Sequence, residues 1–268
     1  MFILQAILLG IIEGLTEFLP ISSTGHLLVA EKLIGYKDAA EIFTVVIQVG
    51  AIVAVVWFYR KDIWAKVTGL LAREKSTLKF WQNWILATIP AGLAGLALDK
   101  KLSSFASLSV IAVALILGGI TIWLVESYHL VRRSGKEPKF DELTTKQALK
   151  VGCYQVLSLV PGVSRSGATI MGGLMSGLDR VTATAFSFYL SLPILVLASG
   201  YKLFKGRHDL ATVSGGSTAI LVGTITTFVV AFFVVGWLLK YVSKHDFKPF
   251  AYYRIILGIV ILAALSIR

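Results

Sequence analysis

The stretch Glu13–His26, EGLTEFLPISSTGH, sets two carboxylates, a proline, three hydroxyls, a glycine and a histidine within an otherwise apolar N-terminal region. Apolar residues precede it over Met1–Ile12 and follow it over Leu27–Ala30. Each apolar part is too short to cross a bilayer, which takes about 20 residues. Pro20 is expected to break the helix at the polar turn. Because non-helical backbone at membrane depth needs a protein or water environment, we interpret the stretch as the turn of a re-entrant helical hairpin.

A second region repeats this design. Val151–Val160 is apolar, PGVSRSGAT (Pro161–Thr169) forms a polar turn, and small and apolar residues follow over Ile170–Leu178. We interpret this region as a second re-entrant hairpin, broken at its proline. Equally spaced glycines bracket the two turns, Gly10 and Gly25 in the first and Gly152 and Gly167 in the second.

The composition is that of a membrane protein. Of the 268 residues, 56% are hydrophobic and 15% charged, and the mean hydropathy is +0.78; a soluble protein carries about 25% charged residues. The net charge of +11 lies in short segments beside apolar runs, as expected of charge facing an anionic leaflet, so we expect no nucleic-acid partner. The single cysteine, Cys153, excludes an internal disulfide and gives no sign of a zinc cluster.

The remaining apolar runs predict the fold class: an all-α polytopic membrane protein with six transmembrane helices and two re-entrant hairpins, in one integral membrane domain over 1–268. Apolar runs of spanning length indicate transmembrane helices. The run Trp84–Leu98 is short and contains Pro90, which indicates a helix packed against its neighbours. The six predicted spans are Phe43–Tyr59, Trp84–Leu98, Leu108–Val125, Ala183–Phe204, Ala219–Leu239 and Ala251–Leu265.

The order of hairpins and spans predicts an inverted repeat. Each hairpin precedes three spans, which gives one repeat over about 1–127 and another over about 146–268. A hairpin returns to its own side, so three spans invert the second copy, and the two hairpins meet near the midplane. Lys and Arg gather in the loops Arg60–Lys79 and Ser127–Lys150 and at Lys240–Lys248, which the positive-inside rule places in the cytoplasm. Both termini and the mouth of the first hairpin then face outward.

Two acids stand out in the first turn. Glu13 and Glu17 are spaced to lie on one helical face. In a low-dielectric site two such carboxylates share a proton or a cation. A solvated helix face is the alternative, but the flanking Ile12, Leu15 and Phe18 are apolar, and intramembrane acids are functional by default.

The hydroxyls that follow have two readings. Ser22, Ser23, Thr24 and Gly25 come directly before an apolar helical run, where hydroxyls commonly act as caps. A helix N-terminus also binds anions, and either serine is a candidate nucleophile with His26 as general base or acid.

The second turn supplies a cation. Arg165 is flanked by Ser164 and Ser166, with Gly167 and Thr169 close behind. A membrane-buried arginine needs an anion, and its guanidinium suits phosphate or carboxylate. The alternative, an internal salt bridge to Glu13 or Glu17, is compatible with phosphate binding.

Together these groups suit phosphoryl transfer, with a nucleophile, a proton shuttle and fixed positive charge. No Walker or kinase glycine pattern is present, so we expect a hydrolase acting on a substrate that arrives from the lipid.

The motifs EGLTEFLPISSTGH and PGVSRSGAT closely resemble the two signature motifs of the bacterial undecaprenyl-diphosphatase family, the bacitracin-resistance proteins. The resemblance covers nearly the whole chain, including FTVVIQVGAI (Phe43–Ile52). It implies removal of the terminal phosphate of undecaprenyl diphosphate for carrier-lipid recycling in cell-wall synthesis, at a site opening to the periplasmic side of the bacterial inner membrane. It also implies a divalent cation, Mg²⁺ or Ca²⁺, which we assign to Glu13 and Glu17.

Carried over by motif, the resemblance assigns the site residues. The catalytic positions are Glu13, Glu17, Ser23, His26 and Arg165. The substrate-binding positions are Ser22, Thr24, Gly25, Gln48, Ser164, Ser166, Gly167 and Thr169.

The mechanism we expect has Ser23 attacking the terminal phosphorus while His26 accepts its proton, followed by hydrolysis of the phosphoserine. Direct activation of water by His26 or a glutamate fits the same residues. The rival class is a secondary transporter, or a flippase for the lipid phosphate, because inverted repeats with broken helices are common in carriers. Small residues in the spans are compatible with a homodimer.

Overall fold

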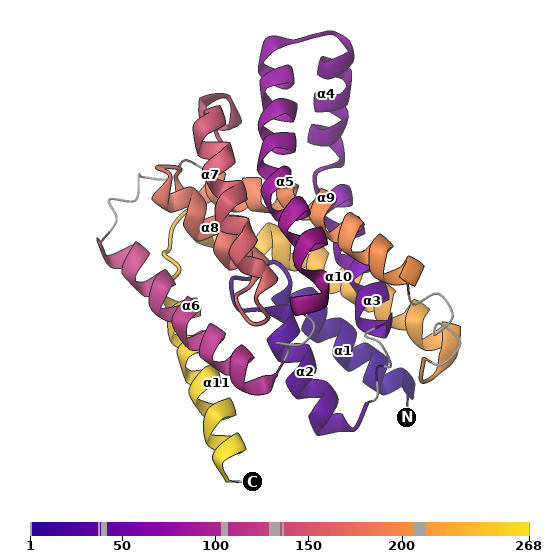
Figure 1. Cartoon of the computed structure of the whole chain (residues 1–268). Coiled ribbons are helices and arrows are strands. Elements are labelled where there is room, and N and C mark those ends of the chain that lie inside the picture. Colours follow the sequence, from indigo (N-terminus) through magenta and orange to yellow (C-terminus); the bar gives the residue numbers. More distant parts are fainter. Residues whose placement is uncertain are drawn as a thin grey trace.

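The computed structural model describes residues 2–36, 38, 42–102, 107–128, 135, 137–205 and 213–267, with backbone only for 99–102 (Figure 1). Within these ranges the chain forms helices and no strands, so the predicted all-α class is confirmed. Several basic residues used to predict the orientation lie outside the described residues or side chains: Lys37, Lys100, Lys101, Arg132, Arg133, Lys136, Arg207 and Arg268.

The described helices follow the predicted order of elements. Two short 3-10 helices, η3 (Phe140–Glu142) and η4 (Val156–Leu159), flank α7. The α-helices are α1 (Phe2–Thr16), α2 (Ser23–Ile34), α3 (Ile42–Phe58), α4 (Arg60–Leu71), α5 (Lys75–Leu102), α6 (Leu108–Tyr128), α7 (Thr145–Gln155), α8 (Arg165–Met175), α9 (Arg180–Lys205), α10 (Gly216–Val242) and α11 (Lys248–Ser266).

Four of the described helices, α6, α9, α10 and α11, are long and apolar enough to cross a membrane. Helices α3 and α4 together make a fifth candidate that is bent by 69°. The chain therefore has the make-up of a multi-pass membrane protein. The predicted span Trp84–Leu98 lies inside α5. Because the first turns of α5 are polar, this helix is not among the candidate membrane spans.

The segment Arg60–Lys79 was predicted as a basic loop, and this prediction is wrong. It is largely helical, because it contains no proline and many good helix formers, and the chain reverses near Arg73, whose φ is 57°. Helix α4 and the first turns of α5 project together at the top of Figure 1, while both chain ends lie toward the bottom.

The first arm of the second hairpin begins earlier than the predicted Val151. Helix α7 starts at Thr145, where the Thr144 side chain and Gln147 form a capping box that fixes the first turn. The apolar run Val151–Val160 is divided between α7, η4 and an extended residue before Pro161.

Close helix contacts hold the two hairpins in place. Helix α1 packs against α10 and α7 packs against α5, in each case through a glycine. A Cβ on Gly10 would collide with the carbonyl oxygen of Gly223, and a Cβ on Gly152 with that of Ala87. Small residues permit this approach of helix backbones in membrane proteins. The two polar turns are thereby fixed against the longer helices.

Candidate active site

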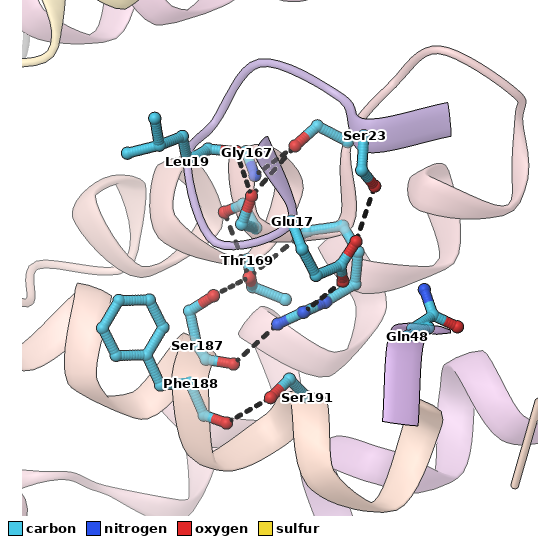
Figure 2. A network of polar contacts seen from close by, with 12 residues as sticks. Glu17, Leu19, Ser23, Gln48, Gly167, Thr169, Ser187, Phe188 and Ser191 are labelled. Atoms are coloured by element: carbon cyan, nitrogen blue, oxygen red, sulfur yellow. Dashed lines mark hydrogen bonds and ion pairs between the residues drawn. The ribbon is translucent and has the colours of Figure 1, made fainter. Parts of the chain in front are cut away.

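Glu17 is the centre of the site, because it contacts one residue from each hairpin. The Ser23 hydroxyl donates to Glu17 Oε2 at 2.6 Å, and Arg165 Nη2 donates to Glu17 Oε1 at 2.7 Å. Ser23 is the first residue of α2 and Arg165 the first residue of α8. Figure 2 shows Ser23 and Glu17 pointing toward one another. Two turns that lie far apart in the sequence therefore meet at one carboxylate.

The Arg165 guanidinium is held on several sides. Besides the ion pair with Glu17, Nη1 donates to the carbonyl oxygen of Ser187 at 3.1 Å, and the guanidinium carbon lies 5.7 Å from the Phe18 ring centre. Its Nε has no partner in the part of the chain that the structure describes. The internal salt bridge considered from the sequence is thus present, and the Nε–H of the guanidinium is left without a partner among the described residues.

Ser22 and Ser164 have the same local structure. Each precedes its helix with a positive φ, 71° and 73°, and each side chain accepts a hydrogen bond from a glycine amide, Gly25 at 3.4 Å and Gly167 at 3.1 Å. Residues other than glycine rarely adopt this backbone conformation, and it often marks functional sites. Because these hydroxyls cap helices, Ser23 is the better placed nucleophile of the first turn.

Ser166 and Thr169 connect the second turn to its surroundings. The fully buried Ser166 hydroxyl donates to the carbonyl oxygen of Leu19 at 2.8 Å. The Thr169 hydroxyl lies 2.6 Å from that of Ser187 and donates to the carbonyl oxygen of Arg165 at 2.9 Å. Figure 2 shows Thr169 and Ser187 side by side. Ser166 thus joins the second turn to the first, and Thr169 joins it to α9.

Glu13 lies one helical turn before Glu17, as predicted, and the Glu17 amide donates to its carbonyl oxygen at 2.9 Å. Its side chain is 1% exposed and accepts a hydrogen bond from Gln48, whose Oε1 accepts from the Ser199 hydroxyl at 3.3 Å. The second carboxylate oxygen, Oε1, has no partner among the described residues. Glu13 therefore has a free oxygen atom for a ligand.

The two ring nitrogens of His26 have hydrogen-bond partners other than Ser23, the residue on which His26 was expected to act as a base. Its Nδ1 lies 2.7 Å from the carbonyl oxygen of Ser22, to which it donates, so its Nε2 accepts from the Tyr253 hydroxyl at 2.7 Å. The two rings stack with centres 5.5 Å apart. The Ser23 hydroxyl donates its hydrogen bond to Glu17 and not to the predicted histidine. Thr24 lies exposed on α2, outside the hydrogen-bond network described above.

Arg254 on α11 is a part of the site that we did not predict. It is 1% exposed, and its guanidinium donates to carbonyl oxygens of both turns, Pro20 and Val163 at 3.1 Å each, and of α6. Arg254 thus ties the two turns together from behind. Arg254 could have been identified from the sequence, because it is a charged residue inside the predicted span Ala251–Leu265. Like Arg165, such a residue marks a functional position.

Comparison with known proteins gives consistent results. Residues 6–260 match the family described as bacitracin resistance protein BacA. Undecaprenyl-diphosphatase 1 of Paraburkholderia xenovorans is 47% identical over 263 residues, covering 96% of this chain and 93% of that protein. The undecaprenyl-diphosphatase of Novosphingobium aromaticivorans is 47% identical over 271 residues, covering 99% of both chains. That of Methylobacillus flagellatus is 45% identical over 273 residues, covering 98% of both.

Proposed function

Because the chain belongs to the bacitracin resistance protein BacA family, we infer that it is an undecaprenyl-diphosphatase. It is a membrane enzyme that hydrolyses undecaprenyl diphosphate to undecaprenyl phosphate and inorganic phosphate, which recycles the carrier lipid for cell-wall synthesis and gives bacitracin resistance. The observation that carries this inference beyond the relatives is the contact of Ser23 and Arg165 with one carboxylate, Glu17. A carrier does not need a nucleophile in that position, so the transporter alternative is not favoured.

The first chemical step starts at Ser23. Its oxygen attacks the terminal phosphorus, the bond from that phosphorus to the bridging oxygen breaks, and undecaprenyl phosphate leaves. The proton of Ser23 passes to Glu17 Oε2, its hydrogen-bond partner at 2.6 Å. Arg165 moves from Glu17 to the phosphate oxygens, which leaves Glu17 free to take that proton and places positive charge on the transferred group.

The second step hydrolyses the phosphoserine. Water attacks the phosphorus and gives its proton to His26, while the bond to Ser23 breaks and the Ser23 oxygen takes back the proton held by Glu17. For this His26 exchanges its Tyr253 partner for the water. Direct attack of water, activated by Glu17 or His26, is the alternative route, and substitution of Ser23 separates the two.

The two helix N-termini form the phosphate cradle in this proposal. The side chains of Ser22 and Ser164 each accept a hydrogen bond from one amide of the first turn, which leaves other first-turn amides of α2 and α8 as donors for a phosphate. We assign phosphate contacts to these first turns, which contain Gly25 and Gly167, and a supporting role to Gln48 through Glu13.

A divalent cation, Mg²⁺ or Ca²⁺, fits the acid pair in one respect. Glu13 has a free carboxylate oxygen, whereas both oxygens of Glu17 are taken by Arg165 and Ser23. The described residues contain no group of three or more metal-ligating side chains, so substrate oxygens and water would complete the coordination. Bound there, the cation would neutralise charge on the diphosphate.

We expect EDTA to abolish most of the phosphate release by the wild type, and added Mg²⁺ or Ca²⁺ to restore it. The Glu13→Gln variant should need a cation concentration higher by about tenfold or more, because one anionic ligand is lost. Phosphate release measured against cation concentration checks this. Unchanged release after exhaustive EDTA treatment would remove the cation from the proposal.

The proposed membrane arrangement keeps six spans, two re-entrant hairpins and the inverted repeat of about 1–127 and 146–268. In its support, Figure 1 has α1 and α2 in the lower half and α7 and α8 in the upper half, and the turns meet through Arg165 and Glu17. We place the protein in the bacterial inner membrane, with the site and both termini on the periplasmic side. Cysteine labelling of residues near each terminus from either side of the membrane tests this orientation.

A homodimer remains part of the proposal. Gly92 on α5 and Gly200 on α9 have open space beside them, so another helix could approach there. Light scattering of the detergent-solubilised protein decides between one and two copies.

The experiment that tests the function is phosphate release from a C55 or shorter polyprenyl diphosphate by the purified protein in detergent. We expect release by the wild type and the lipid monophosphate as the second product. Substrate flux into liposomes with no phosphate release would instead support the transporter.

A further inference from the structure

Gln155 is a buried residue whose side-chain amide has no hydrogen-bond partner in the part of the chain that the structure describes. It is the last residue of α7, its exposure is 0%, and neither its side-chain oxygen nor its nitrogen has a hydrogen-bond partner among the described residues. Burying an amide without partners is costly, so such a group calls for an explanation. A ligand with polar atoms is one.

The position of Gln155 corresponds to that of Glu13. Helices α1 and α7 each bury a stripe of four residues with the same spacing, and the fourth residue of each stripe is polar and lies close to the turn; α1 also buries Gly14 and Thr16. In order, the stripe of α1 is Ala6, Leu9, Gly10 and Glu13, and that of α7 is Ala148, Val151, Gly152 and Gln155.

The same correspondence extends through the turns. Ser22 and Ser164 share their backbone conformation and capping bond, and the next residues, Ser23 and Arg165, both bind Glu17. A pseudo-two-fold axis that exchanges the hairpins therefore passes close to this contact. Glu13 lies near enough to Arg165 for their charges to interact. The same relation places Gln155 toward Ser23.

We propose that Gln155 is a substrate-binding residue whose side-chain amide donates to a phosphate oxygen of the diphosphate beside Ser23. The inference rests on the proposed function. It also explains the chemical difference between the two equivalent positions. On one side the carboxylate of Glu13 faces Arg165, while on the other a neutral donor of the same length faces the anionic substrate without repelling it.

The substitution that tests this is Gln155→Met, which keeps the side-chain length and removes both polar atoms. We expect kcat/KM to fall by about 10- to 100-fold, the effect of losing one hydrogen bond to a charged group. The Tm should stay the same or rise, because an unbonded polar group has been removed from the interior. Gln155→Glu, which sets a charge against the diphosphate, should lose more.

Gln5→Met is the matched control. Gln5 lies on α1, the helix that corresponds to α7, and its side-chain nitrogen donates to the carbonyl oxygen of Ile34 at 2.9 Å, away from the turns. This variant should lower the Tm and leave kcat/KM within about twofold.

Two results would overturn the inference: a Gln155→Met protein with kcat/KM within about twofold of wild type, or one whose Tm falls while its kcat/KM per folded molecule is unchanged. If Gln155→Met does not fold, Gln155→Asn decides, since it keeps the amide but draws it back from the site; full activity of that variant also overturns the inference. Wild-type protein that releases no phosphate would refute the proposed function itself, which is a separate outcome.

Discussion

Replacing Ser23 by alanine is expected to reduce phosphate release by about ten-thousandfold or more, because the attacking oxygen is lost. The fold should persist, since within the described residues the Ser23 hydroxyl makes one hydrogen bond, to Glu17, and the cap of α2 belongs to Ser22. Steady-state release from a polyprenyl diphosphate in detergent measures the effect. Acid quenching of the wild type during turnover, followed by mass spectrometry, should find phosphate on Ser23.

Ser22→Ala is the comparison that isolates the role of the neighbouring hydroxyl. It removes the cap, which costs about 1 kcal/mol of stability, and its activity should fall far less than that of Ser23→Ala. A Ser23→Ala protein that keeps near-full activity would exclude the covalent route and leave direct attack by water.

Replacing Arg165 by alanine is expected to reduce phosphate release by about a thousandfold or more, the loss seen when a cation that stabilises a transferring phosphoryl group is removed. It also leaves Glu17 buried without its partner, which costs about 3–5 kcal/mol of folding stability. Release and Tm should therefore be measured on the same preparation.

Arg165→Lys separates charge from geometry. Lysine keeps the positive charge but lacks the planar fork whose two nitrogens bond Glu17 and the carbonyl oxygen of Ser187. We expect the Arg165→Lys variant to regain much of the stability, but little of the activity, that Arg165→Ala loses. Activity at the wild-type level in Arg165→Ala would remove the arginine from the chemistry, whereas wild-type activity in Arg165→Lys would show that positive charge alone suffices there.

The parts that could be predicted from the sequence are those with a strong local signal. Apolar runs locate α3, α6, α9, α10 and α11, and the residues of the two polar turns stand out against apolar surroundings. The salt bridge of Arg165 with an acid was also predicted, as one of two roles considered for this residue, because a buried cation needs an anion.

The features of the site and fold that could not be predicted from the sequence depend on tertiary contacts. The partners of Ser23 and His26 are decided by how the turns fold over each other, which the spacing of residues along the chain does not encode. Ser187 enters the site through its backbone carbonyl and a hydroxyl on an apolar helix, where serine is unremarkable in a sequence. Helix α4 was missed because its charge suggested a loop while its helix propensity suggested otherwise.

The central claim, that the two hairpins meet in one site, is tested most directly by a double-mutant cycle of Glu17→Gln and Arg165→Met on the free energy of unfolding. If the two side chains are paired as described, the double variant should lose less stability than the sum of the single variants, by about 1 kcal/mol or more. Losses that add to within about 0.5 kcal/mol would contradict the pairing and with it the shared site.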